Sequence, residues 1–295
     1  MKRILTTITC GLLMTTSIYA QETFLKRKVA IGRFSNETQY AKSIFYDKNN
    51  DPMGKQASDI LAAKLAGTEK FIFIERQDFD KIIQEYNDSS QINQRLGADY
   101  LIIGSITEYG RKNIGTQNFG SRSKEQIVEA GVSIRLVDVS TGLVIFSGEA
   151  KGEATAKDKT VLGFGKSADF DATLSDKAIT AAINKLVEGI INKCTDSPWK
   201  SYLLAFEEGN YIISGGKSQG IKEGDTFAVF SKGRKVKNPQ TGAYIELPGK
   251  EIGKVKVVTM IGNTPLDEVS IVELINGEID NTAFDKYFIT ETSKN

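Results

Sequence analysis

The chain has 295 residues, 38 lysines and arginines against 37 aspartates and glutamates, and no histidine. A formal net charge of +1 with no basic stripe argues against a nucleic-acid partner, and the lack of histidine excludes Ser-His-Asp and Cys-His catalysis and histidine metal sites. With only two cysteines, clustered structural zinc is excluded as well, so we predict a protein that is not an enzyme and has no cofactor or metal.

Residues 1–20 have the pattern of a secretory signal peptide. Two basic residues precede an apolar run from Ile4 to Ile18, and Ala20 suits the cleavage site. A lipid anchor on Cys10 would need a leucine and a small residue before it, but Thr-Ile-Thr stands there. No later run approaches the ~20 apolar residues of a spanning helix. We therefore expect a cleaved, exported protein without a lipid anchor, in the periplasm or at the outer membrane.

The first elements after the signal are a strand and a helix. Lys28 to Phe34 alternates apolar with polar or small residues, as a strand does. A polar loop follows and ends at Asp51, a plausible N-cap with Pro52 in the first helical turn. Gly67 closes the helix. The apolar positions of this helix are Ile60, Leu61 and Leu65.

Helices and strands continue to alternate through the next hundred residues. Phe71 to Glu75 is a buried-strand pattern, and apolar residues at helical spacing follow it. A short helix capped by Ser90 ends at Gly97. Three further strands are expected, interrupted by two polar insertions. The strands are Tyr100–Ile106, Val132–Val137 and Leu143–Ser147, and the insertions are Gly110–Gln126 and Lys151–Leu174.

A long amphipathic helix from Ser175 to Lys193 completes the first domain. Its apolar stripe is broad enough to lie on a sheet, and Cys194 at its end is expected to be a small buried residue. The order of elements predicts an α/β domain with a mixed sheet over residues 21–196. The stripe is formed by Ala178, Ile179, Ala182, Ile183, Leu186, Val187, Ile190 and Ile191.

Asp196-Ser197-Pro198 marks the boundary to a second module, residues 197–295. Short strand patterns with glycine-rich turns replace the helical period, and five or six strands in about ninety residues favour a small SH3-like β-barrel. Ser214–Phe227 and Asn238–Gly242 resemble the C-terminal domain of the flagellar assembly protein FlgT. Barrels of that kind usually bind other proteins or carbohydrate.

Two Gly-Lys-Ser triplets do not form nucleotide sites. A phosphate-binding loop needs a glycine five residues before its Gly-Lys pair. Thr160 occupies that position for Gly165-Lys166, and Tyr211 occupies it for Gly216-Lys217. We therefore interpret the glycines as turn residues.

Three segments of the first domain resemble the CsgG family, the curli production assembly/transport component of bacterial outer membranes. They are Phe73–Gln77 (FIERQ), Gly104–Ile106 and Arg135–Gly142 (RLVDVSTG). The resemblance covers Lys28 to about Lys193. It implies a homo-oligomer at the outer membrane that serves curli-type fibre secretion or assembly. The implied partners are further copies of the same chain and secreted fibre subunits or other envelope proteins. A soluble periplasmic scaffold, similar to FlgT or to activators of peptidoglycan synthases, is the alternative.

The resemblance also implies a channel constriction in the loop before the first helix. In the family this loop carries a tyrosine and, four residues on, asparagine followed by phenylalanine. Tyr46 and Asn50 match this spacing, whereas Asp51 replaces the phenylalanine. The simpler interpretation is a polar loop whose aromatic residues fold back on the domain.

The family's membrane hairpins would fall on the two polar insertions. Around Gly110, charges alternate onto both faces, with Arg111 on one and Glu108 and Lys112 on the other. A lysine or arginine facing lipid costs ~2–4 kcal/mol near the midplane. The insertions therefore suit a solvated or protein-bound ribbon, although charges facing a lumen would still permit a channel. The apolar candidates for contact with a membrane or partner are Ile114, Phe119, Val161, Leu162 and Phe164.

Overall fold

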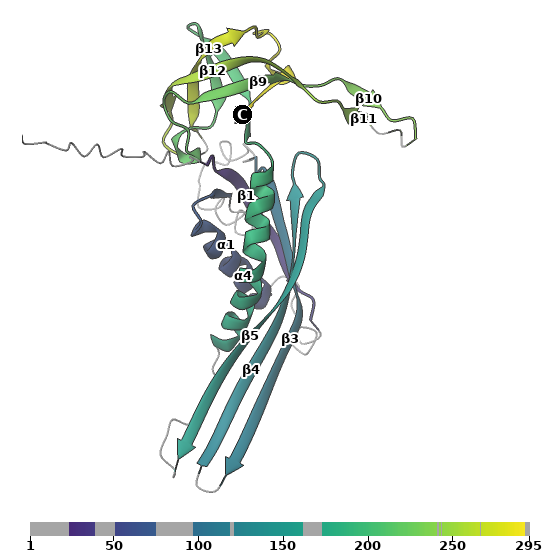
Figure 1. Cartoon of the computed structure of the whole chain (residues 1–295), viewed down its shortest axis with the longest axis vertical. Coiled ribbons are helices and arrows are strands. Elements are labelled where there is room, and N and C mark those ends of the chain that lie inside the picture. The colour runs from purple at the N-terminus through teal and green to yellow at the C-terminus, as the bar shows by residue number, and fades with distance from the viewer. Residues whose placement is uncertain are drawn as a thin grey trace, which may run out of the picture.

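The computed structural model describes residues 24–38, 51–74, 97–118, 121–161, 173–240, 242, 244–265 and 267–292. They form a sheet with two helices on one face, followed by a separate antiparallel sheet that curls into a nearly closed barrel (Figure 1). A two-stranded arm extends sideways from the barrel.

The first sheet is mixed, as the sequence predicts. Its spatial order is β2-β1-β3-β4-β5, with β1 parallel to β2 and β3 and the remaining pairs antiparallel. The strands are β1 (Arg27–Asn36), β2 (Phe71–Ile74), β3 (Tyr100–Asn118), β4 (Ser121–Asp138) and β5 (Val144–Val161).

Two helices cover one face of this sheet, α1 (Pro52–Ala66) and α4 (Thr173–Asp196). The predicted cap of α1 is confirmed, because the Asp51 carboxylate accepts a hydrogen bond from the Gly54 N–H and Gly67 ends the helix. The apolar stripe of α4 is buried against the sheet. The shared core includes Leu61, Leu65, Ile102, Ile134, Leu136, Ile179, Ile183 and Ile190.

The strands of this domain are much longer than predicted. β3, β4 and β5 contain 19, 18 and 18 residues, and they continue through Gly110–Asn118, Ser121–Gln126 and Lys151–Val161. The expectation that polar insertions interrupt the strands is wrong for these residues. Ladder bonds to β4 pair the backbone groups that point toward it, and these bonds form whatever the side chains are, so an apolar pattern is not required.

The second sheet contains seven strands in the order β6-β14-β9-β12-β13-β8-β7. Its first and last strands, β6 (Lys200–Ser201) and β7 (Leu203–Glu207), are adjacent in sequence and join through Tyr202. One chain segment therefore borders both ends of the sheet and nearly closes it. The SH3-like assignment and the resemblance to FlgT remain predictions. The other strands are β8 (Asn210–Ser214), β9 (Thr226–Ser231), β12 (Lys250–Ile261), β13 (Val269–Gly277) and β14 (Tyr287–Glu291).

Short elements complete the second module. The arm consists of β10 (Lys235–Lys237) and β11 (Tyr244–Glu246), and two 3-10 turns, η2 (Lys217–Gln219) and η3 (Phe284–Lys286), lie between strands. Gly215 has a φ of 101°, which supports its interpretation as a turn glycine. The barrel core contains Trp199, Ile213, Phe227, Val229, Val255, Val257, Val272 and Ile289.

Candidate functional site

The most distinctive surface is the part of the first sheet that extends beyond the helices. We call it the ribbon, defined as residues 107–118 of β3, 121–131 of β4 and 151–161 of β5. Figure 1 shows these three strands running on past the end of α4 as a slender projection. Of the candidate hairpin residues, Ile114 and Val161 lie on the ribbon.

At its root, the ribbon has α4 lying directly on one of its faces. A Cβ on Gly152 would lie 2.1 Å from the Ala178 carbonyl oxygen and 2.4 Å from the Ala182 backbone nitrogen. Only glycine permits this approach. Val128 and Ala130, on the same side of β4, are fully or almost fully buried.

Polar residues hold the start of α4 to the same face. The Tyr109 hydroxyl lies 2.7 Å from the Ser175 hydroxyl, and the Arg111 guanidinium donates to both hydroxyls, at 3.3 and 3.0 Å. The predicted position of Arg111 on the face opposite to Glu108 and Lys112 therefore agrees with the structure. This arginine is used to anchor a helix.

The opposite face of the ribbon is exposed and charged. Lys151 on β5 forms an ion pair with Glu108 on β3, at 2.5 Å, although β4 lies between the two strands. Gly131 occupies the intervening position of β4 and offers no side chain to obstruct the pair. The Thr107 hydroxyl makes a second bridge between β3 and β5 by donating to the Glu149 carboxylate at 2.9 Å.

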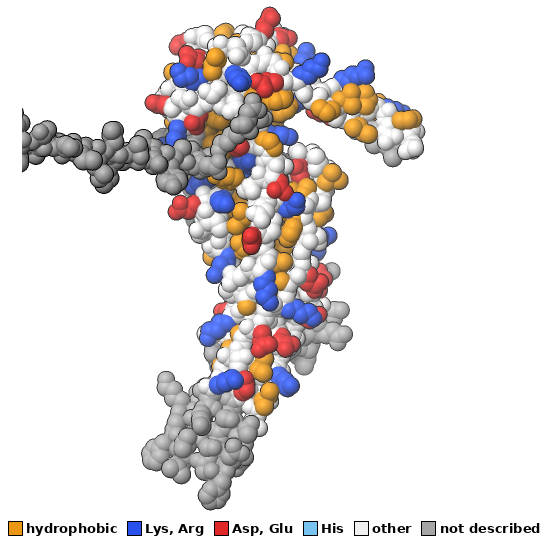
Figure 2. Space-filling model, in the orientation of Figure 1, with side chains coloured by type: hydrophobic (Ala, Val, Ile, Leu, Met, Phe, Trp, Pro, Cys, Tyr) orange, Lys and Arg blue, Asp and Glu red, His pale blue; other side chains and the backbone are white. Residues whose placement is uncertain are grey.

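Farther along this face, Lys157 pairs with Glu125 at 3.1 Å. Ile114 is the register neighbour of Glu125 and is 37% exposed. An apolar residue placed beside an ion pair does not give the continuous apolar band of a lipid-facing surface. Figure 2 shows lysine, arginine, aspartate and glutamate side chains intermixed along this part of the molecule.

The two outer strands of the ribbon differ in how their edges are covered. The pairing of β1 with β3 ends at Asn36 and Ile106, so residues 107–118 have no strand beside them on that side within the described ranges. On β5, the Lys185 ammonium of α4 donates to the Lys151 carbonyl oxygen at 2.6 Å. Helix α4 therefore covers part of the β5 edge, whereas the β3 edge is open among the described residues.

Several predicted site residues lie outside the described residues, namely Tyr46, Asn50, Phe119, Leu162 and Phe164. The channel-constriction prediction therefore remains a prediction. Val161 is the last residue of β5 and pairs with Ser121.

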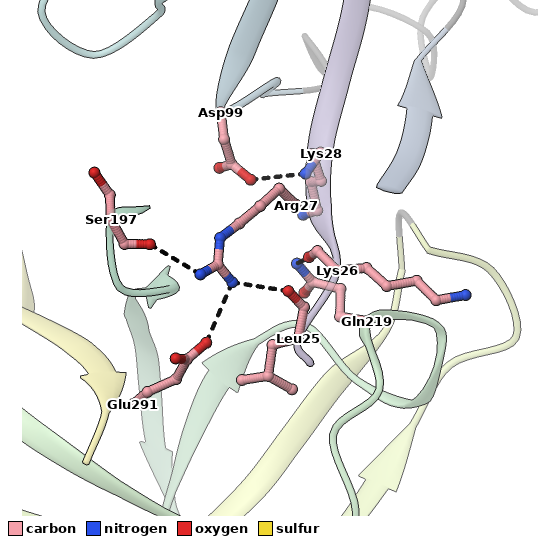
Figure 3. A network of polar contacts seen from close by, with 8 residues as sticks. All are labelled: Leu25, Lys26, Arg27, Lys28, Asp99, Ser197, Gln219 and Glu291. Carbon is pink, nitrogen blue, oxygen red and sulfur yellow. Dashed lines mark hydrogen bonds and ion pairs between the residues drawn. The ribbon is translucent and has the colours of Figure 1, made fainter. Parts of the chain in front are cut away.

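A second polar cluster joins the two folded modules (Figure 3). The buried Arg27 guanidinium donates to the carbonyl oxygens of Leu25 and Ser197, at 2.8 and 2.9 Å, and to the Glu291 carboxylate at 3.2 Å. Its three acceptors come from the N-terminal segment, the turn after α4 and the last barrel strand. Leu25 is itself part of the barrel core. The junction therefore involves both ends of the described chain.

Asp99 adds a further contact at this junction. Its carboxylate accepts a hydrogen bond from the Lys28 N–H at 2.8 Å. Burial raises the pKa of Asp99 above its ordinary value of 3.8, although the hydrogen bond from Lys28 acts in the opposite direction. The buried Cys194 thiol has its pKa raised to about 12 by burial, so it is an inert core group.

Sequence reasoning missed the open β3 edge and the Arg27 cluster. Arg27 looks like an ordinary basic residue next to a strand, and its acceptors are up to 264 positions away along the chain. Residues 107–118 are mostly polar, so their sequence carries no strand pattern from which the open edge could be predicted.

Within the described ranges, neither long helix has the unbroken apolar stretch that crossing a bilayer would require. The same residues contain no group of three or more histidine, cysteine, aspartate or glutamate side chains suited to holding a metal ion.

Comparison with protein families identifies the first module. The model of the family described as "Curli production assembly/transport component CsgG" matches residues 14–224. The chain belongs to the CsgG family. The match includes the helix-covered sheet and the ribbon, and it ends within the barrel module.

CsgG-family membership is supported by a curated relative. "Putative lipoprotein NMB1126/NMB1164" of Neisseria meningitidis serogroup B (strain ATCC BAA-335 / MC58) is 32% identical over 179 residues, which cover 60% of this chain and 80% of that protein. The name of this relative does not support our expectation that the chain lacks a lipid anchor.

Solved structures resemble the CsgG-family module less closely. Lipoprotein GNA1162 from Neisseria meningitidis is 18% identical, with a TM-score of 0.29 and coverage of 58% of this chain and 99% of that chain. The PelC dodecamer from Paraburkholderia phytofirmans is 19% identical, with a TM-score of 0.27 and coverage of 55% and 86%. Because both scores are low, these structures assign no function to this chain.

Proposed function

We propose that this CsgG-family chain is a non-catalytic protein of the bacterial cell envelope. It assembles as a homo-oligomer and serves curli-type fibre secretion or assembly at the outer membrane. The observation that carries the proposal is the open edge of β3 over residues 107–118, on a ribbon that projects from a family module.

An exposed strand edge is a template for pairing with another chain, because no strand of its own sheet lies beside it. Proteins usually shorten such edges, bend them or cover them. Here the edge belongs to a 19-residue strand that projects from the domain. Pairing between ribbons of identical copies, repeated around a closed ring, would cover the open edge of each ribbon with a neighbouring copy.

The charged face indicates which side of such a ring would meet water. On the exposed face of the ribbon, Glu108 pairs with Lys151 and Glu125 pairs with Lys157. This face suits an aqueous lumen or the periplasm, since lipid would impose ~2–4 kcal/mol on each lysine near the midplane.

A soluble periplasmic scaffold is the second candidate function. Arg111 lies on the helix-covered face and Lys112 in the next position along β3, so charges occupy both faces of the ribbon root. A ribbon with this distribution could bind another envelope protein without entering a membrane.

The test is to express the full-length gene, isolate the mature protein from envelopes in detergent and image it. Rings with a belt of detergent, retained in membranes after carbonate washing, would support fibre secretion through the outer membrane. Oligomers released by carbonate would favour the scaffold. A monomer in both fractions would contradict the proposal.

A further inference from the structure

The arm of the barrel module presents apolar side chains to solvent. It comprises residues 232–249 with strands β10 and β11, and it leads away from the barrel (Figure 1). Tyr244 is 70% exposed, Ile245 49% and Leu247 38%. A two-stranded hairpin such as the arm is marginally stable in water by itself. Figure 2 shows apolar side chains along the arm. These properties indicate a surface that a partner covers.

The arm is also basic. Its exposed cations are Lys232, Arg234, Lys235 and Lys237, whereas Glu246 is its one acidic residue. The arm therefore has a net charge of +3. A matching partner would offer apolar or aromatic contacts with a rim of carboxylates.

Such a surface is present on the barrel itself. Glu207 ends β7 and Glu208 lies in the turn to β8. The segment between β13 and β14 carries Glu278, Asp280 and Asp285, and all five side chains are exposed. We call these residues, with Phe206 and Phe284, the acidic corner. Lys286 is the only basic residue in these two segments.

Ring contacts hold the two halves of the acidic corner together. The ring centroids of Phe206 and Tyr211 lie 4.7 Å apart, and those of Tyr211 and Phe284 lie 6.4 Å apart. Phe206 remains 39% exposed. Hydrogen bonds from Thr282 lower the pKa of Asp280, so this carboxylate stays ionised at neutral pH.

The corner lies beside the root of the arm. The Lys232 N–H donates to the Lys286 carbonyl oxygen at 2.7 Å. A hollow of about 540 Å³ at this place is lined by residues of both, including Lys235 and Asp285. Since arm and corner share one end of the barrel, a two-fold axis between two copies would place both contacts in a single interface.

We infer that the arm docks on the acidic corner of a second copy of this chain, in a reciprocal exchange that pairs two barrels. The net charge of +3 on the arm then meets five carboxylates, and Tyr244, Ile245 and Leu247 are covered against Phe206 and its neighbours. This contact is independent of the ribbon, and it assigns a role to the module outside the family domain.

The tip of the arm argues against a lipid partner. The turn beyond β10 is polar, with the Gln240 N–H donating to the Asn238 side-chain oxygen at 2.8 Å and the Gly242 N–H to the Asn238 carbonyl oxygen at 2.8 Å. A hairpin that enters a membrane tip first needs apolar residues at its leading end, because buried polar groups there would lose their hydrogen bonds to water. Here the apolar residues lie along the sides of the arm.

Charge exchange tests the inference on the full-length protein. One double variant reverses charge on the arm (Lys235→Glu with Lys237→Glu), and a second reverses it on the acidic corner (Glu207→Lys with Glu208→Lys). Each should weaken the pairing of two copies at least tenfold, as measured by sedimentation. Combining all four changes should restore it. Lys217→Glu with Lys222→Glu, matched in charge and at exposed positions away from the arm, should have no effect. Circular dichroism confirms that each variant is folded.

Cysteine cross-linking provides a readout that does not depend on charge. Ile245→Cys and Phe206→Cys variants, purified separately and mixed, should form a disulfide between copies, whereas the buried Cys194 takes no part. Absence of this disulfide, or failure of the four-residue variant to restore pairing, would overturn the inference. The inference would also be overturned if the arm variants lost binding to anionic lipid vesicles while the molar mass of the assembly stayed unchanged.

Discussion

Glu108 and Lys151 form an ion pair across an intervening strand, with Nζ and Oε2 2.5 Å apart over Gly131 of β4. A Cβ at position 131 would lie 2.9 Å from the Thr107 hydroxyl and 3.1 Å from the Glu108 Cβ. The glycine thus permits both the bulge at Thr107 and the contact between β3 and β5. This arrangement fixes a polar surface at the root of the ribbon.

Gly131→Val should destabilise the protein by about 1–3 kcal/mol, because the new side chain crowds the bulge in β3. The free energy of unfolding from urea titration measures this loss. Gly110→Val is the matched control, since nothing lies within 4 Å of a Cβ there. Equal effects at the two positions would contradict the assigned role of Gly131.

Gly152→Ala should cost more than its small volume suggests. Its Cβ would meet the backbone of α4 at Ala178 and Ala182, and neither contact can be relieved by a side-chain rotation. We expect a loss of about 3 kcal/mol, at the upper end for overpacking. Gly115→Ala, with open space around its Cβ, should leave the urea midpoint almost unchanged. A tolerated Gly152→Ala would mean that α4 does not rest on the ribbon.

Arg27→Met should loosen the junction between the modules, since it leaves the Leu25 and Ser197 carbonyl oxygens without their donor. A loss of about 2–4 kcal/mol is expected for a buried charged donor with several acceptors. Thermal unfolding and limited proteolysis after α4 measure it. Glu291→Gln should cost less, because the Glu291 side chain is 40% exposed. The reverse order would be inconsistent with Arg27 as the centre of the cluster.

Asp99→Asn should change how stability depends on pH. Burial raises the pKa of Asp99 in the folded chain, so the folded state holds this proton more tightly than the unfolded state does. The contribution of Asp99 to stability therefore falls as pH rises from about 3.8 through its raised value. Asparagine cannot ionise, so the variant should gain stability relative to the wild type over this window. A difference that is constant between about pH 4 and about pH 7 would refute the assignment.

Sequence patterns predicted the elements in which apolar side chains recur with a regular period or a capping residue marks the end. The stripe of α4 and the Asp51 cap of α1 follow from helical period and capping chemistry. The mixed sheet follows from the order of helices and strands. In each case the local pattern and the tertiary contacts favour the same structure.

The ribbon and the junction could not be predicted in the same way. Residues 107–118 are held by ladder bonds to β4, so their polar side chains gave no apolar alternation to detect. The contacts of Arg27 depend on residues brought together from distant parts of the chain. The arm was equally hidden, because Lys235–Lys237 and Tyr244–Glu246 are too short to stand out as strands.

The most direct test of ribbon assembly is a proline scan of the open β3 edge, with molar mass measured by light scattering in detergent. Of two neighbouring residues in an edge strand, one directs its N–H outward, so either Lys112→Pro or Asn113→Pro removes a donor from the open edge without breaking the ladder to β4. That variant should keep the wild-type circular dichroism spectrum and lose the ring-sized oligomer, which leaves at most two copies paired through their arms. A wild-type oligomer that persists in both folded proline variants would contradict assembly through the ribbon.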